Sequence, residues 1–225
     1  MIEIATGNDI VFTGGDGFTN YAQLGQGGIF ASGNHGGTTT ITTANDIRFT
    51  GGTDQSYAQL GQGGIGGGGD LTGTISILSA NNILFTAGST QAYAHLGQGG
   101  VGNSGNHDGT ITITSANDIV FTAGSDDQSY AQMGQGGQAA SADAGMGHSG
   151  DITITEANNI TFTGIGDFSY AQLGNGGFFA NGDPSGAITI ASANDISVNA
   201  GASQAYSQIG HGGLGPGALT AETST

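Results

Sequence analysis

The sequence predicts an all-β protein, a parallel β-helix (β-solenoid) of six repeats of about 36 residues with three short strands each. The main reason is a phrase that recurs six times, reading Tyr-Ala-Gln-Leu-Gly-Gln-Gly-Gly from Tyr21 and Tyr-Ser-Gln-Ile-Gly-His-Gly-Gly from Tyr206. Short runs of alternating apolar and polar residues, typical of half-buried strands, are the second reason. The third is a composition of 47 Gly and 2 Pro, which indicates turns and disfavours helix, because glycine costs about 1 kcal/mol relative to alanine in a helix.

The six tyrosines set the repeat boundaries, with steps of 36, 36, 37, 40 and 36 residues. We therefore expect a single array over residues 1–217, followed by a short polar tail over 218–225. Its units lie near residues 1–36, 37–72, 73–108, 109–149, 150–185 and 186–217. Because a solenoid needs a polar cap at each end and neither end resembles one, we expect a segment of a longer protein or a unit that stacks end to end.

The first two expected strands of each unit place isoleucine or phenylalanine inside and mostly threonine outside, as in residues 152–154 and 160–162. The inward pairs of the first strand are Ile2/Ile4, Thr39/Ile41, Ile75/Ile77, Ile111/Ile113, Ile152/Ile154 and Ile188/Ile190. Those of the second are Ile10/Phe12, Ile47/Phe49, Ile83/Phe85, Ile119/Phe121, Ile160/Phe162 and Ile196/Val198. Two outward columns result: Thr13, Thr50, Thr86, Thr122, Thr163 and Asn199; and Thr40, Ser76, Thr112, Thr153 and Thr189.

A turn is expected between these two strands, where every unit carries an asparagine. Asparagine tolerates left-handed backbone angles and bonds locally to the backbone. Stacked in register, the amides could also bond from coil to coil. The residues are Asn8, Asn45, Asn81, Asn117, Asn158 and Asn194.

The third expected strand is the segment that begins at each tyrosine. We place alanine and leucine inside, because the leucine position is apolar in all six units. Tyrosine and glutamine then share the outer face, where stacked tyrosines would form an interaction stripe, since tyrosine is favoured at interfaces. Stacking of the rings within the molecule is the alternative interpretation. The stripe comprises Tyr21, Tyr57, Tyr93, Tyr130, Tyr170 and Tyr206.

Three other architectures are compatible with a repeat of this length. A unit could form two coils of about 18 residues, and its rise would then be about twice the 4.8 Å strand spacing. A propeller blade needs four strands per unit, and we count three. The abundance of glycine also permits a disordered repeat.

The chain is strongly acidic, with a net charge of −16 and Arg48 as its one basic residue. Nucleic acids and anionic membrane surfaces attract proteins through lysine and arginine, so this composition excludes both as partners. The sequence contains no apolar run of about 18 residues that would predict membrane insertion. It also contains no cysteine, which excludes disulfides and thiolate chemistry.

We expect no enzymatic activity. Hydrolysis of a glycoside needs two facing carboxylates, and the one adjacent acidic pair is Asp126-Asp127, in a single turn of a single unit. The Gly-x-Gly-x-x-Gly spacing that begins at Gly61, Gly97 and Gly210 is not followed by a predicted helix. It therefore indicates turns and not a dinucleotide site.

No cofactor is expected, and calcium is the one metal with candidate ligands. These weak candidates follow the turn asparagine and are Asp9, Asp46, Asp118 and Asp195. In a one-coil stack Asp9 and Asp46 become neighbours. Two carboxylates at so short a distance either bind a cation or have a raised pKa. Solvated turns are the main interpretation. The histidines His35, His95, His107, His148 and His211 lack metal-binding spacing and are expected in solvent.

The phrases Gly-Asp-Ile-Thr-Ile-Thr from Gly150, Ala-Asn-Asp-Ile from Ala116 and the Tyr21 phrase resemble those of filamentous-haemagglutinin-like bacterial exoproteins. The Tyr206 phrase is similar to a Tyr-Ala-Gln-Ile-Gly-His-Gly-Gly repeat of giant adhesins in that group. The resemblance covers essentially the whole chain. It implies secretion, a right-handed parallel β-helix, and a role in surface adhesion or extracellular matrix.

Three functions fit this sequence. The first is a non-catalytic structural segment of a secreted bacterial adhesin or extracellular fibre, whose partners are cell-surface or matrix components. The second is a self-assembling filament subunit that stacks on itself head to tail, since open heterologous contacts give fibres. The third is an ice- or glycan-binding solenoid, which requires flat and unbroken columns such as those of threonine.

Overall fold

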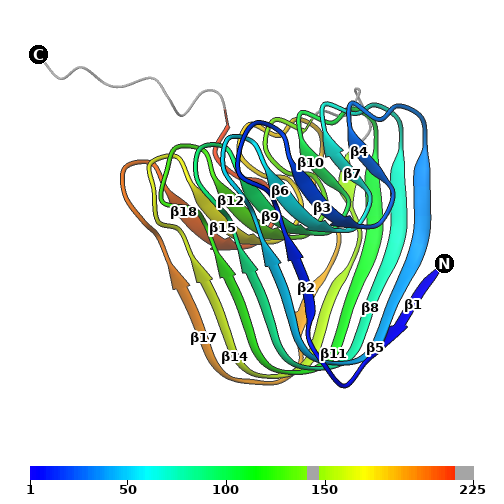
Figure 1. Ribbon diagram of the computed structural model, residues 1–225. Coiled ribbons are helices and arrows are strands. Elements are labelled where there is room, and N and C mark those ends of the chain that lie inside the picture. Colours follow the sequence, from blue (N-terminus) through cyan, green and yellow to red (C-terminus); the bar gives the residue numbers. More distant parts are fainter. Residues whose placement is uncertain (141–146, 216–225) are drawn as a thin grey trace, which may run out of the picture.

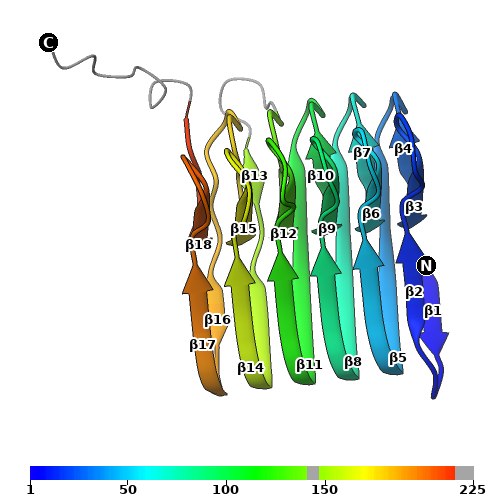
Figure 2. The same ribbon diagram turned by 60° about the vertical axis from the view of Figure 1, so that its left-hand side comes forward.

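The computed structural model describes residues 1–140 and 147–215 and shows a parallel β-solenoid of six coils (Figure 1). Successive coils lie side by side along one axis (Figure 2). The described residues contain no helix. The predicted fold class is therefore confirmed. The expected polar tail, the last two positions of the expected array and part of the long connection after Gln138 lie outside the described residues.

Each coil contains a long bent strand path and a four-residue tyrosine strand, and three coils add a short glycine strand. The long strands are β5 (His35–Thr50), β8 (Leu71–Thr86), β11 (His107–Thr122) and β14 (Ile152–Thr163), preceded by the two-residue β13 (His148–Ser149). In the end coils this path is divided into β1 (Ile2–Ala5) and β2 (Ile10–Thr13), and into β16 (Ile188–Ile190) and β17 (Ala193–Asn199). The tyrosine strands are β3 (Tyr21–Leu24), β6 (Tyr57–Leu60), β9 (Tyr93–Leu96), β12 (Tyr130–Met133), β15 (Tyr170–Leu173) and β18 (Tyr206–Ile209). The glycine strands are β4 (Gly27–Ile29), β7 (Gly63–Ile65) and β10 (Gly99–Val101).

Neighbouring coils pair in parallel, with each residue opposite its counterpart in the next repeat. Ile75 lies opposite Ile111, for example, and Tyr93 lies opposite Tyr130. The long strands form one sheet in the order β1-β5-β8-β11-β14-β16, with β2 paired to β5 and β17 to β14. The tyrosine strands form a second sheet and the glycine strands a third. One repeat therefore makes one coil, and the two-coil, propeller and disordered alternatives are wrong.

The expected turn between the first two runs of each unit is corrected by the structure. In β5, β8, β11 and β14 both runs belong to one strand, which bends at the Ala-Asn corner (Figure 1). Pairing continues through the bend: Ala80 lies opposite Ala116, and Asn82 lies opposite Asp118. A neighbouring coil with the same bend satisfies the backbone at the corner, so the chain needs no separate turn.

The first core lies between the long strands and the alanine and leucine side chains of the tyrosine strands. Its phenylalanines form a column of parallel rings, with centroids 4.8 to 5.1 Å apart. The column comprises Phe12, Phe49, Phe85, Phe121 and Phe162. Burial of each such side chain stabilises the fold by about 1.5–3 kcal/mol, so most of the stability comes from contacts between coils.

Glycine is required where the turn after the tyrosine strand lies against the next coil. Gly97 has a φ of 148°, and a Cβ atom there would lie 1.8 Å from the carbonyl oxygen of Gly134. Gly102, a few residues later, has a φ of 64° and no heavy atom within 4 Å of the same position. The two glycines thus differ in steric demand, although both have a positive φ.

We expect Gly97→Ala to lower the free energy of unfolding by about 2–4 kcal/mol, because it adds a backbone clash to an unfavourable φ. Gly102→Asn is the matched control and should cost less than about 1 kcal/mol, since asparagine tolerates the left-handed region. Urea denaturation of both variants measures the difference. Equal losses would contradict the packing assigned to this turn.

Candidate functional site

The tyrosine stripe expected on the outer face is buried. Tyr57, Tyr93, Tyr130 and Tyr170 have no exposed surface, and with Ile65 they belong to a second core. Their rings stack in parallel at 4.6 to 5.1 Å, so the intramolecular alternative describes their arrangement. The physical reason is that the glycine turn folds back over the tyrosine strand, so that both faces of this strand are covered.

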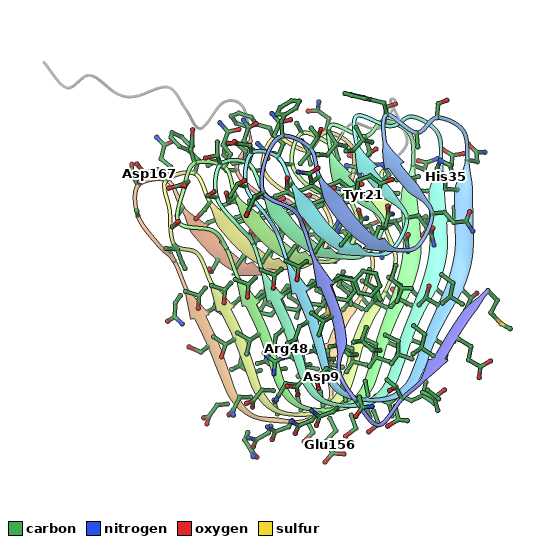
Figure 3. All side chains as sticks on the ribbon, viewed as in Figure 1. Asp9, Tyr21, His35, Arg48, Glu156 and Asp167 are labelled. Atoms are coloured by element: carbon green, nitrogen blue, oxygen red, sulfur yellow. The ribbon has the colours of Figure 1, made fainter. Side chains whose placement is uncertain are left out.

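Only the end coils leave a tyrosine accessible. Tyr21 is 50% exposed, and it lies at the rim of the first coil (Figure 3). Tyr206 is partly buried in the last coil. Burial raises the pKa of Tyr93, Tyr130 and Tyr170 well above its usual value, because a phenolate there would lose its hydration.

Glutamine side chains that follow the tyrosines hold successive coils together. Nε2 of Gln59 donates to the carbonyl oxygen of Gln62 in its own coil at 3.0 Å and to those of Gly97 and Gly99 in the next coil at 3.2 Å. Gln23 and Gln172 make the equivalent contacts, and Gln132 makes the two that reach the next coil. Sequence reasoning placed this column outside. The recurrence of glutamine at one position opposite tightly turned glycines was the available signal.

A second amide column lies within the glycine turn itself. The backbone N–H of Gln62 donates to Oε1 of Gln98 at 2.8 Å, and the N–H of Gln98 donates to Oε1 of Gln135 at the same distance. Nε2 of Gln135 also donates to the carbonyl oxygen of Gly109 at the start of β11. These amides therefore link neighbouring coils and also link the turn to the long strand.

The corner asparagines bond from coil to coil, together with the residues that follow them. Nδ2 of Asn45 donates to Oδ1 of Asp9 at 2.7 Å, and Nδ2 of Asn159 donates to Oδ1 of Asp118 at 2.8 Å. Asn194 bonds in the same way to Asn158. Of the expected contacts between corner asparagines, the structure shows one, that of Asn194 with Asn158. The other contacts at the corner end on the residue that follows the asparagine of the neighbouring coil, as Asn45 does on Asp9.

The calcium candidates do not form a cation site. Asp9 and Asp46 are neighbours, but the guanidinium of Arg48 contacts both, and Figure 3 shows Asp9 beside Arg48. The amide of Asn45, and then Arg48, lower the pKa of Asp9. Asp118 has asparagine opposite it in both neighbouring coils, and Asp195 lies opposite another asparagine. Within residues 1–140 and 147–215, no group of three acidic or histidine residues could hold a metal.

All five histidines were expected in solvent, and three of them are buried instead. His95, His107 and His148 have no exposed surface. His95 occupies the glutamine column of the tyrosine strands, and His107 lies opposite Leu71 at the start of a long strand. His95 stands where the preceding coil has glutamine, and His107 stands where the preceding coil has leucine. These counterparts in the repeat were the signal in the sequence that both positions face inward.

Threonine lies in register on the outer faces of the long strands. Thr112 lies opposite Ser76 and Thr153, and Thr86 lies opposite Thr50 and Thr122. Other residue types lie beside the threonine columns. Leu78, for example, is 40% exposed in the same strand as Ser76. The threonine rows are regular but are not a uniform hydroxyl surface.

The acidic side chains otherwise gather at the corners of the coils. A polar groove of about 410 Å³ is lined by Asp70, Asp108 and Asp183 together with Asn106. It spans four consecutive coils on the outside of the long-strand path, because Ser149 of β13 also lines it.

Comparison of the chain with protein-family models, with curated proteins and with solved structures finds no match. In the described part of the chain, no helix is long and apolar enough to span a membrane.

We expect Tyr93→Ala to lower the free energy of unfolding by about 3–5 kcal/mol, because it leaves a cavity between two stacked rings. Tyr93→Phe is the control and should cost less than about 1 kcal/mol, since the Tyr93 hydroxyl makes no hydrogen bond to another described residue. Urea denaturation distinguishes the two. If both variants changed stability by less than about 0.5 kcal/mol, as surface substitutions do, the second core would be disproved.

Proposed function

We propose that this chain is a non-catalytic structural segment of a secreted bacterial adhesin or extracellular fibre. The observation that supports this proposal is the parallel pairing that connects all six coils in register, apart from one shift after Ile4 in the first coil. Two packed cores and the amide columns connect each coil to the next. Such a molecule resists bending and provides length, which is what a stalk or fibre requires.

The location and partners proposed for it are extracellular. The absence of cysteine suits a long chain that must remain unfolded until export, and the resemblance to bacterial exoproteins points the same way. The outer strand faces and the acidic corners would contact cell-surface or matrix components. With the tyrosines buried, the outward threonines replace them as the regular surface available to a partner.

A second candidate is a filament subunit that stacks head to tail. Each coil edge is complementary to the next, and the end coils carry matching positions. Phe12 of the first coil corresponds to Val198 of the last, where Val198 is 40% exposed, and Tyr21 corresponds to Tyr206. Contact between copies would repeat the interface found between interior coils.

Electron microscopy of the purified chain over a concentration series tests both proposals. A structural segment gives discrete short rods whose length does not depend on concentration. A filament subunit gives fibres that lengthen with concentration, with an axial spacing of about 4.8 Å between coils. Compact particles without a rod axis would contradict both.

The regular threonines favour a third candidate, a solenoid that binds ice or glycan. Here replacement of Thr112, Thr153 and Thr189 by tyrosine should abolish ice shaping or glycan retention, because it interrupts one column in three adjacent coils. The same replacements at Thr50, Thr86 and Thr122, which lie beyond the corner of the same long strands, are the control. Absence of ice shaping and glycan retention in the unaltered chain would remove this candidate and leave the first two standing.

A further inference from the structure

The three buried histidines are concentrated around the fourth coil, which comprises β11 and β12. His107 begins β11, His148 lies opposite it in β13 of the fifth coil, and His95 in β9 of the third coil contacts the fourth. In the coils on either side of His95 its column holds glutamine, and the column of His107 holds Leu71 and then the partly buried His35. Titratable groups thus interrupt two columns at one place along the solenoid.

His107 and His148 form a stacked pair that can hold only one proton between them. Their ring centroids are 4.8 Å apart, and the two Nδ1 atoms are 2.9 Å apart. At this distance one Nδ1 must donate and the other must accept, so both rings cannot carry a proton there. The Nε2 atom of each ring is buried and makes no hydrogen bond to a described residue.

His95 is held in its neutral form by the fourth coil. Its Nε2 atom donates to the carbonyl oxygen of Gly134 at 2.8 Å, which leaves Nδ1 as a bare acceptor. Nδ1 is buried and has no partner among the described residues. The ring lies edge-on to Tyr93 and Tyr130, which are neutral and fully buried. A proton on Nδ1 would therefore place an uncompensated charge in the second core.

No carboxylate in the described residues balances a positive charge at these rings. Among the described residues the carboxylates closest to the pair along the chain are Asp108, which lines the polar groove on the outside of the long-strand path, and Asp151, which is exposed. Arg48 contacts Asp9 and Asp46 at another corner. Among the described residues, the polar groups that contact these rings include the carbonyl oxygen of Gly134 and two neutral tyrosines at His95, and the partner ring in the His107/His148 pair.

Burial lowers the pKa of His107 to about 3, with a further contribution from His148, and lowers that of His95 to about 4. Burial also lowers the pKa of His148. An exposed histidine has a pKa near 6.5, so the opened chain binds more protons than the closed one below that pH. Stability is therefore complete above about pH 6.5 and decreases as the pH falls toward the folded pKa values.

We propose that the contacts of the fourth coil with its two neighbours form an acid-labile joint, which opens at mildly acidic pH while the coils on either side remain closed. A first proton on the His107/His148 pair places a charge in a buried site, and a second proton also breaks the shared Nδ1–Nδ1 hydrogen bond. A proton on Nδ1 of His95 places a buried charge at the contact between the third and fourth coils. The proposal depends on the fold and not on the proposed structural role.

Hydrogen exchange of the full chain at pH 7.5 and pH 5.0, corrected for the intrinsic pH dependence of amide exchange, tests this joint. We expect the equilibrium constant for opening, measured on peptides from β11 and β12, to be higher at pH 5.0 than at pH 7.5. The increase is about 30-fold for each histidine that titrates only in the open state. Peptides from β6 in the second coil, which lacks a fully buried histidine, should change less than about 3-fold.

The variant His107→Leu places in β11 the residue that Leu71 supplies one coil earlier, and it should lower the acid response by about 30-fold, the contribution of one histidine. His35→Leu is the matched control, because it makes the same substitution in the same column where the ring is only partly buried. It should leave the response of β11 and β12 intact. The proposal would be overturned if the opening constants of β6 and β12 rose equally at pH 5.0. It would also be overturned if the rise in β11 and β12 were the same in His107→Leu as in the unaltered chain.

If His107→Leu does not fold at pH 7.5, His95→Gln is the second variant. Glutamine occupies this position in the coils on either side, so the replacement should restore the bonds to the next glycine turn. We expect it to reduce the acid-induced exchange of β9 and β12 by about 10-fold or more. A wild-type response in this variant would also count against the joint.

Discussion

Every part of this structure depends on the parallel pairing of each residue with its own counterpart one repeat away. Because coils stack in register, a side chain is packed above and below by its equivalents, as Phe85 is by Phe49 and Phe121. A column is therefore the unit of stability. Residues that stack well on themselves, such as aromatic rings, isoleucine and primary amides, fill the interior. This is the condition that repetition imposes on any solenoid.

The same constraint decides where charge can lie. A column of identical carboxylates would repel itself, so aspartate alternates with asparagine at the corner, and Asp118 has an amide above and below it. The one neighbouring pair, Asp9 and Asp46, is accompanied by the single arginine. Interior polar columns consist of glutamine, which donates and accepts without a net charge. The buried histidines are the exceptions, and for this reason they carry the chemistry that we infer.

The proposed structural role follows from uniformity, and the acid-labile joint follows from a local departure from it. A rod made of equivalent interfaces has no preferred place to open. Substitution of a titratable residue in two interior columns creates such a place without altering the backbone path. The surface remains regular on either side, so a partner bound to the outer threonines of other coils would not be disturbed by opening at the fourth coil.

The sequence by itself determined the repeat and the inward positions of the first core, because apolar alternation and a 36-residue period require no knowledge of neighbours. The structure decided that one repeat makes one coil and not two, through the pairing of each residue with its counterpart in the next repeat. The sequence could not determine which face of the tyrosine strand is covered. That depends on the glycine turn folding back, which a period-two pattern does not encode. Only the tertiary structure placed Tyr93, Gln59 and His107 inside, since burial of a polar side chain depends on partners that lie one coil away in space.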